Sequence, residues 1–164
     1  MENKKMFTLV KLLIIIAIIS IFMVIVPQVL FENMENSKIY KLESDVSAIK
    51  SASISYYIDK SKLTYENTVT WQKKDGKIIV NSGFKDNPIK QKIENLDMPY
   101  NGSYILMSSE DHKKYLVLLI APDGEISRNG IKKLKNDYKN SIDIEYLQGK
   151  INMCITLLNN ESKS

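Results

Sequence analysis

An apolar stretch near the N-terminus limits what this chain can fold into. It runs over the 25 residues from Phe7 to Phe31, FTLVKLLIIIAIISIFMVIVPQVLF, of which only five are not apolar. Its last 20 residues form, as an α-helix, a rod about 30 Å long, which is the thickness of a bilayer's hydrocarbon core. A helix that is apolar on every side needs burial all round, and the rest of the chain is too polar to provide it. The stretch therefore predicts a membrane-spanning helix.

A cleaved secretory signal peptide is the alternative interpretation, with Lys4 and Lys5 as its charged region. The apolar run is longer than the roughly 7–15 residues of such a signal, and no small-residue cleavage site follows it. We therefore expect the helix to be retained as a single membrane pass. Lysines precede it and Glu32 and Glu35 follow it, so the positive-inside rule places the N-terminus in the cytoplasm and the C-terminal part outside.

Length and charge constrain the part that follows. The chain has 164 residues, which suits one membrane helix and one globular domain of about 100 residues. The net charge is +4, and the first 11 residues contribute +2 because Lys4, Lys5 and Lys11 outnumber Glu2. The remaining domain is nearly neutral and gives little support for a nucleic-acid partner.

Beyond the apolar stretch the helical pattern continues as an amphipathic segment, residues 32–62. One face carries side chains at three- and four-residue spacing: Ile39, Leu42, Val46, Ile49, Ser53 and Tyr56. The opposite face is polar: Lys41, Glu43, Ser44, Ser47 and Lys50. We expect one helix of about 50 residues that ends between Asp59 and Lys62.

Residues 63–164 read mainly as strands. The predicted strands are Thr68–Gln72, Lys77–Val80, Ser103–Met107, Tyr115–Ala121, Ile142–Leu147 and Lys150–Leu158. Turns are predicted at Asp75-Gly76, Pro122-Asp123-Gly124 and Gln148-Gly149, and short helices at Pro88–Leu96 and Ile131–Tyr138. The predicted fold class is α+β, with the outer half of the long N-terminal helix packed on an antiparallel sheet.

The residues offer little chemistry for an enzyme. His112 lies in a polar loop without evident partners, and Asp75-Gly76 and Asp123-Gly124 lack the carboxylate spacing of calcium loops. Cys154 sits in an apolar run and is predicted to be a buried small hydrophobe. We expect no catalytic residue, no cofactor, no metal and no small-molecule substrate. One basic cluster, Lys132, Lys133, Lys135 and Lys139, is either a solvated helix face or a DNA contact, and the former is favoured because no aromatic stacking platform is evident nearby.

The N-terminus resembles that of type IV pilins and pseudopilins. A short basic leader precedes Phe-Thr-Leu, a charged residue, a long apolar helix and Pro-Gln. The matching residues are Phe7, Thr8, Leu9, Val10, Leu12, Leu13, Ala17, Ile18, Ile19, Pro27 and Gln28. The resemblance implies a leader at residues 1–6, cleavage between Met6 and Phe7 with N-methylation of Phe7, and the pilin fold. It also implies other pilin subunits, a prepilin peptidase and an assembly ATPase as partners.

Two residues depart from that family's pattern. Met6 stands where the family usually has the glycine at which the peptidase cuts. Lys11 stands where the family usually has a glutamate that neutralises a neighbouring subunit's N-terminal amine. Lys11 cannot do so, and after cleavage it would lie four residues from an amine of like charge. Either Lys11 extends to the headgroups, or this subunit is released from that contact, as at a filament tip.

These observations predict a structural minor subunit of a type IV pilus or a type II secretion-like filament. Two alternatives stay open. One is a single-pass membrane protein that never polymerises and displays a binding domain outside the cell. The other is a DNA-binding subunit of a competence-type filament.

Overall fold

The first helix, α1, extends from Glu2 to Lys60 and ends inside the predicted interval. This computed structural model describes residues 2–60, 68–82, 88–93, 95–108, 115–124 and 126–159. The chain divides into two units, residues 1–37 and 38–164.

The first unit consists of α1 up to residue 37. Its described large apolar side chains between Leu12 and Ile19 are 48–62% exposed. Ser20 donates its hydroxyl hydrogen to the Ile16 carbonyl at 2.8 Å, which satisfies this polar group within the helix. Among the residues whose side chains are described, no helix holds a stretch long and apolar enough to span a membrane. The predicted span includes residues 21–29, whose side chains lie outside the described set.

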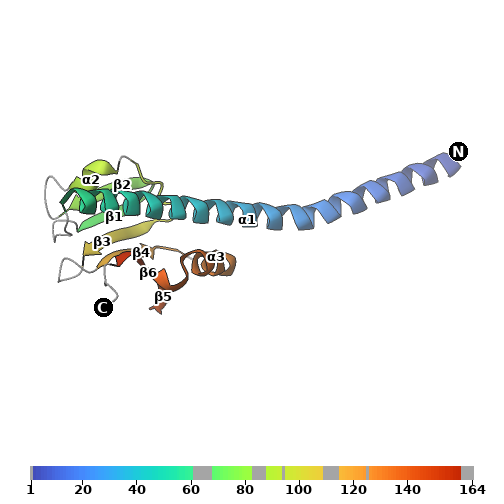
Figure 1. The fold of residues 1–164 in the computed structure, drawn as a ribbon. Coiled ribbons are helices and arrows are strands. Elements are labelled where there is room, and N and C mark those ends of the chain that lie inside the picture. Colours follow the sequence, from blue (N-terminus) through green and yellow to red (C-terminus); the bar gives the residue numbers. More distant parts are fainter. Residues whose placement is uncertain are drawn as a thin grey trace. The chain divides into compact units, whose positions relative to one another are not determined.

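The second unit contains a six-stranded antiparallel sheet, as the sequence predicts (Figure 1). The strand order is β2-β1-β3-β4-β6-β5. The strands are β1 (Val69–Lys74), β2 (Lys77–Ser82), β3 (Gly102–Ser108), β4 (Tyr115–Pro122), β5 (Ile142–Leu147) and β6 (Lys150–Asn159). Two-residue turns at Asp75-Gly76 and Gln148-Gly149 close two of the hairpins, and all four residues have positive φ angles.

The core lies between α1 and one face of this sheet. All six residues of the predicted stripe, from Ile39 to Tyr56, are buried. Strand β6 alternates in the same way, because Ile151, Met153, Ile155 and Leu157 are buried and the residues between them are half-buried. In Figure 1 the later part of α1 lies along the sheet, so the amphipathic segment and the strands together form one core.

Three local predictions need correction. The helix predicted from Pro88 to Leu96 ends at Lys92, since Ile93 and residues 95–98 take no regular structure. The helix predicted from Ile131 is α3, Arg128–Tyr138; it begins earlier because the Ser127 hydroxyl caps it by accepting from the Gly130 N–H at 3.0 Å. Cys154 is half-buried rather than buried, because the strand turns its side chain away from the core.

Two glycines allow close approaches that a side chain would block. A Cβ at Gly102, where φ is +127°, would collide with the Ala121 carbonyl and the backbone at Pro122. A Cβ at Gly130 would lie 2.9 Å from Cδ1 of Ile39. The first glycine fits β3 against β4, and the second lets α3 lie against α1.

Candidate functional site

The residues predicted as sites fall mostly outside the described side chains. Met6, Phe7 and Lys11 lie in α1, and their side chains are not among those described. The cleavage site and the intramembrane charge therefore stay predictions. His112 also lies outside the described residues.

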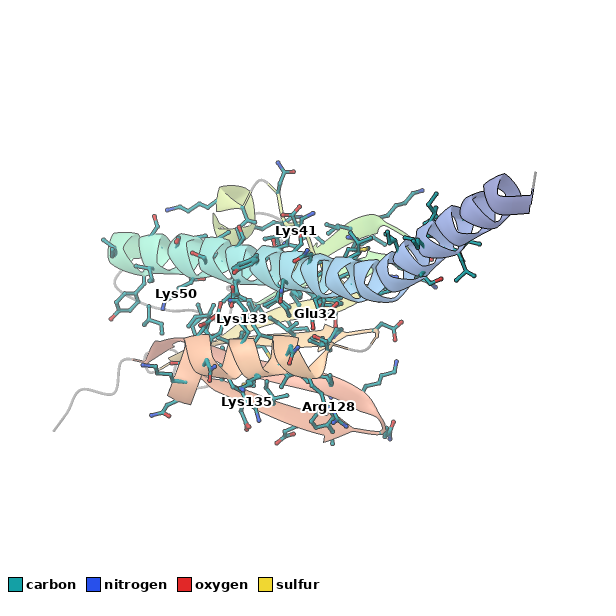
Figure 2. The ribbon with its side chains drawn as sticks, turned by 90° about the vertical axis from the view of Figure 1, so that its right-hand side faces the viewer. Glu32, Lys41, Lys50, Arg128, Lys133 and Lys135 are labelled. Carbon is teal, nitrogen blue, oxygen red and sulfur yellow. The ribbon has the colours of Figure 1, made fainter. Side chains whose placement is uncertain are left out.

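The basic cluster is divided by the structure. Lys132, Lys135 and Lys139 are exposed, in agreement with a solvated face. Lys133 is not part of that face: in Figure 2 it lies between α3 and α1, whereas Lys135 and Arg128 extend from the side of α3 away from α1. The cluster thus presents three cations, not four, and its case as a DNA contact weakens.

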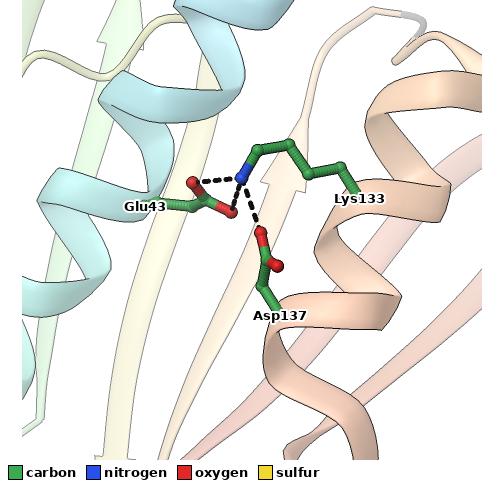
Figure 3. A network of polar contacts seen from close by, with 3 residues as sticks. All are labelled: Glu43, Lys133 and Asp137. Carbon is green, nitrogen blue, oxygen red and sulfur yellow. Dashed lines mark hydrogen bonds and ion pairs between the residues drawn. The ribbon is translucent and has the colours of Figure 1, made fainter.

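Lys133 joins the two helices through two carboxylates (Figure 3). Its ammonium donates to both oxygens of Glu43 on α1 at 2.7 and 2.8 Å and to Asp137, one turn further along α3, at 2.5 Å. It also lies 4.7 Å from the centre of the Tyr40 ring, within range of a cation–π interaction. The network holds α3 against α1.

Burial and the neighbouring charges together shift the pKa values in this network, and burial raises that of Glu43. Desolvation lowers the pKa of Lys133, but its hydrogen bonds with Asp137 and Glu43 outweigh this and raise it above its usual value. The bond from Lys133 is also the main cause that lowers the pKa of Asp137. Burial, then Glu43 and Asp137, raise the pKa of the nearby Tyr138 to about 12. At neutral pH the ammonium stays charged and continues to hold both carboxylates.

A second carboxylate on α1, Asp45, is buried at 3% exposure. It accepts hydrogen bonds from the N–H groups of Asp97 and Met98, both at 2.8 Å, and from the Tyr104 hydroxyl at 3.1 Å. Burial raises the pKa of Asp45, and the three hydrogen bonds oppose that rise. Sequence analysis missed this residue, although it lies three residues after Leu42 and thus on the buried stripe.

Lys73 on β1 bonds to the carbonyl groups of the same two residues, Asp97 and Met98. Its ammonium donates to the carbonyls of Asp97 and Met98, at 3.1 and 2.7 Å. The fully buried Met98 has a positive φ of 38°, a backbone conformation that costs free energy in a non-glycine residue. Asp45 and Lys73 together satisfy both peptide units, so we call the four residues Asp45, Lys73, Asp97 and Met98 the Asp45 clamp.

A half-open cleft of about 550 Å³ lies between α3 and the β5–β6 hairpin. Ile126, Ile131 and Ile151 form apolar parts of its lining, and Arg128 and Tyr146 contribute to it as exposed residues. Lys150 and Asp123, which also line it, form an ion pair at 3.0 Å. The size is that of a binding site for a small group or a protruding side chain.

The Lys133 network and the Asp45 clamp join elements of the fold together. Among the described residues, neither brings a nucleophile into contact with a base. A long helix that covers one face of a six-stranded antiparallel sheet defines the type IV pilin-like class of structural proteins. The chain is similar to the structure of the major type IV pilin PilA1 from Clostridium difficile, with a TM-score of 0.52 and 25% sequence identity. That similarity covers 77% of this chain and 98% of that one.

A family model described as "PilW, C-terminal" matches residues 33–116, which is just over half of the chain. The chain therefore belongs to this pilin family. No curated protein matches it. As a pilin-like protein it is a structural, non-enzymatic subunit whose partners are other pilus subunits and whose place is the pilus or the cell surface.

Proposed function

We propose that this chain is a minor pilin or pseudopilin, a structural subunit of a type IV pilus or a type II secretion-like filament. The observation that carries the proposal is the exposed apolar surface of α1 between Leu12 and Ile19. Such a surface on a helix needs lipid or other helices around it. The membrane surrounds this surface with lipid before assembly, and the filament core surrounds it with other helices afterwards.

The proposed division of the chain follows from the same logic. Residues 1–6 are a leader that a prepilin peptidase removes, and residues 7–31 anchor the chain in the cytoplasmic membrane before assembly. Residues 32–62 extend the helix into the domain, and residues 63–164 form the part outside the cell. An assembly ATPase then drives the subunit into the filament.

The minor role rests on Met6 and Lys11. Met6 departs from the residue at which the peptidase cuts in this family, and Lys11 departs from a residue on which the polymer contact of every repeating subunit depends, so a rare subunit tolerates them better than an abundant one. Lys11→Glu tests the point: a subunit confined by its missing carboxylate should spread along the filament. If the lysine merely extends to the headgroups, its distribution should not change.

The first experiment determines the N-terminal residue of the protein from its native cells, by intact mass measurement and terminal sequencing. We expect a chain that begins at an N-methylated Phe7 and is present in sheared filaments in small amounts. A chain that keeps Met1 to Met6 and stays out of filaments would favour the non-polymerising membrane protein. A chain that is the principal filament component would contradict the minor role.

A further inference from the structure

The cleft between α3 and the β5–β6 hairpin has an apolar interior. Ile126 and Ile151 line it and are only 5% and 6% exposed, whereas Tyr146, also in the lining, is 64% exposed and lies at its edge. The cleft is half-open, and its volume of about 550 Å³ is that of a small-molecule site. A branched aliphatic interior of this kind takes up a large apolar side chain, because both surfaces then leave water.

The polar lining carries one charge that is not balanced within the cleft. Lys150 and Asp123 form an ion pair at 3.0 Å and so neutralise each other. Arg128 also lines the cleft, and within the described part of the chain no hydrogen bond or ion pair involves it. It extends from the side of α3 away from α1 (Figure 2). A guanidinium binds a carboxylate through two parallel N–H···O bonds, so the cleft offers an anion a partner beside an apolar interior.

We propose that the cleft binds the C-terminal residue of a partner protein, and that this residue has a large apolar side chain. The side chain packs against Ile126 and Ile151, and the terminal carboxylate pairs with Arg128. The last residue of a chain carries both groups on one Cα atom. It therefore matches an apolar depression and a cation that line the same small cleft.

Other carboxylate ligands fit this lining less well. An acidic sugar carries hydroxyl groups around its ring, and burial against isoleucines would leave these groups without hydrogen-bond partners. An internal aspartate or glutamate brings the chain on both sides of it, for which a cleft of this volume has little room. The free end of a chain meets neither difficulty.

The inference goes beyond the proposed filament function and does not depend on it. The lining lies between residues 123 and 151, entirely within the second unit. If the chain enters filaments but binds no peptide end, the inference is wrong and the filament function stands. If it binds peptide ends but never enters filaments, the inference stands and the filament function is wrong.

Synthetic peptides test the preference for an apolar last residue. Each peptide carries fluorescein at its N-terminus, a glycine-serine spacer and one variable last residue. Fluorescence anisotropy measures its binding to the full-length chain in detergent, with detergent alone as the background. We expect saturable binding, with a dissociation constant below about 1 mM, for peptides that end in phenylalanine, leucine or methionine. Peptides that end in serine or aspartate should bind at least about tenfold more weakly. Equal binding by all peptides, or saturable binding by none, would overturn the inference.

A second comparison tests the carboxylate. A terminal carboxamide in place of the carboxylate should weaken binding at least about tenfold, because the guanidinium loses its anionic partner. Arg128→Gln should weaken binding of the free acid by a similar factor and leave binding of the carboxamide nearly unchanged, since both changes remove the same contact. A carboxamide that binds the wild type as well as the acid does would contradict the pairing. So would equal binding by an amidated peptide with an internal glutamate.

The matched control is Lys135→Gln. It also removes one cation from α3, but Lys135 is exposed and does not line the cleft, so both affinities should stay unchanged. Equal losses from Arg128→Gln and Lys135→Gln would reduce the effect to general charge and contradict the assigned role of Arg128. Fluorescence of Trp71, the single tryptophan and a buried one, reports whether each variant folds.

Discussion

Two carboxylates on α1, two residues apart, hold different parts of the domain in different ways. Asp45 is buried and faces two backbone N–H groups and a tyrosine hydroxyl. Glu43 is half-buried and faces the ammonium of Lys133. One contact uses neutral donors away from water, and the other uses opposite charges near it.

Charge alone is therefore a poor guide to which of the two contacts stabilises the fold more. Ion pairs near solvent contribute little, because water solvates both groups well when they separate. A buried carboxylate is costly, but once it is present its removal leaves its donors unsatisfied in the core. We therefore expect the Asp45 clamp to matter more than the Lys133 network, although the latter has more formal charge.

The largest expected effect is that of Asp45→Ala. It leaves the N–H groups of Asp97 and Met98 without their acceptor, and the free energy of unfolding should fall by about 3 kcal/mol. Denaturation of the full-length chain in detergent, followed by Trp71 fluorescence, measures it. Asp143→Ala, which removes an exposed carboxylate, is the control and should change little. Equal losses from both variants would contradict the comparison.

Lys133→Met should cost less, about 1 kcal/mol. Methionine keeps much of the apolar stem and removes the charge, so the change removes the interactions of the ammonium with Glu43, Asp137 and the Tyr40 ring. A double-mutant cycle with Glu43→Gln gives the coupling between the two residues. That coupling should shrink in 1 M salt, since screening acts on half-exposed pairs. A coupling larger than the Asp45→Ala effect would reverse our ranking.

Asp45 and Asp137, the second carboxylate that Lys133 contacts, should depend on pH in opposite directions, whereas burial raises the pKa of Glu43 as it raises that of Asp45. Burial raises the folded pKa of Asp45 above its usual 3.8, so its contribution to stability is fully present below 3.8 and is lost as the pH rises through the folded value. Lys133 lowers the folded pKa of Asp137, so its contribution is present above 3.8 and is lost as the pH falls through the lowered value.

The measurement is the free energy of unfolding of the wild type minus that of each asparagine variant, across the acidic range. The difference should fall with rising pH for Asp45→Asn and rise with pH for Asp137→Asn. Parallel slopes for the two variants would show that burial does not dominate the titration of Asp45.

The fold was predictable because its signals are local. The three- and four-residue spacing from Ile39 to Tyr56 identified the buried face of α1, and alternation along β6 with the turn at Gln148-Gly149 identified the last hairpin. Each of these patterns lies in the same short stretch of sequence as the structural element that it predicts. The Ser127 cap was missed, although a serine ahead of a basic amphipathic helix is a signal of the same local kind.

The two carboxylate sites were not predictable in the same way, because their partners are distant. Asp45 meets a backbone N–H 52 residues away, and Glu43 meets a lysine 90 residues away. Which side chain reaches which loop depends on how α1, α3 and the sheet pack, and one sequence holds no record of that. In the sequence Lys133 therefore looked like the solvated lysines beside it. Only the structure shows that it differs from them, because it lies between α3 and α1 (Figure 2).

The smallest expected effect concerns the ion pair at the cleft. Lys150 and Asp123 are 3.0 Å apart, but their side chains are 68% and 66% exposed. Lys150→Ala should therefore change the free energy of unfolding by less than about 0.5 kcal/mol, which is the usual contribution of an exposed pair. It serves as a comparison for Lys133→Met, since each change removes one lysine from an ion pair; Lys133 differs in being less exposed and in contacting a second carboxylate and the Tyr40 ring. A loss as large as that of Lys133→Met would mean that exposure does not separate the two pairs, and the reason given for the strength of the Lys133 network would fail.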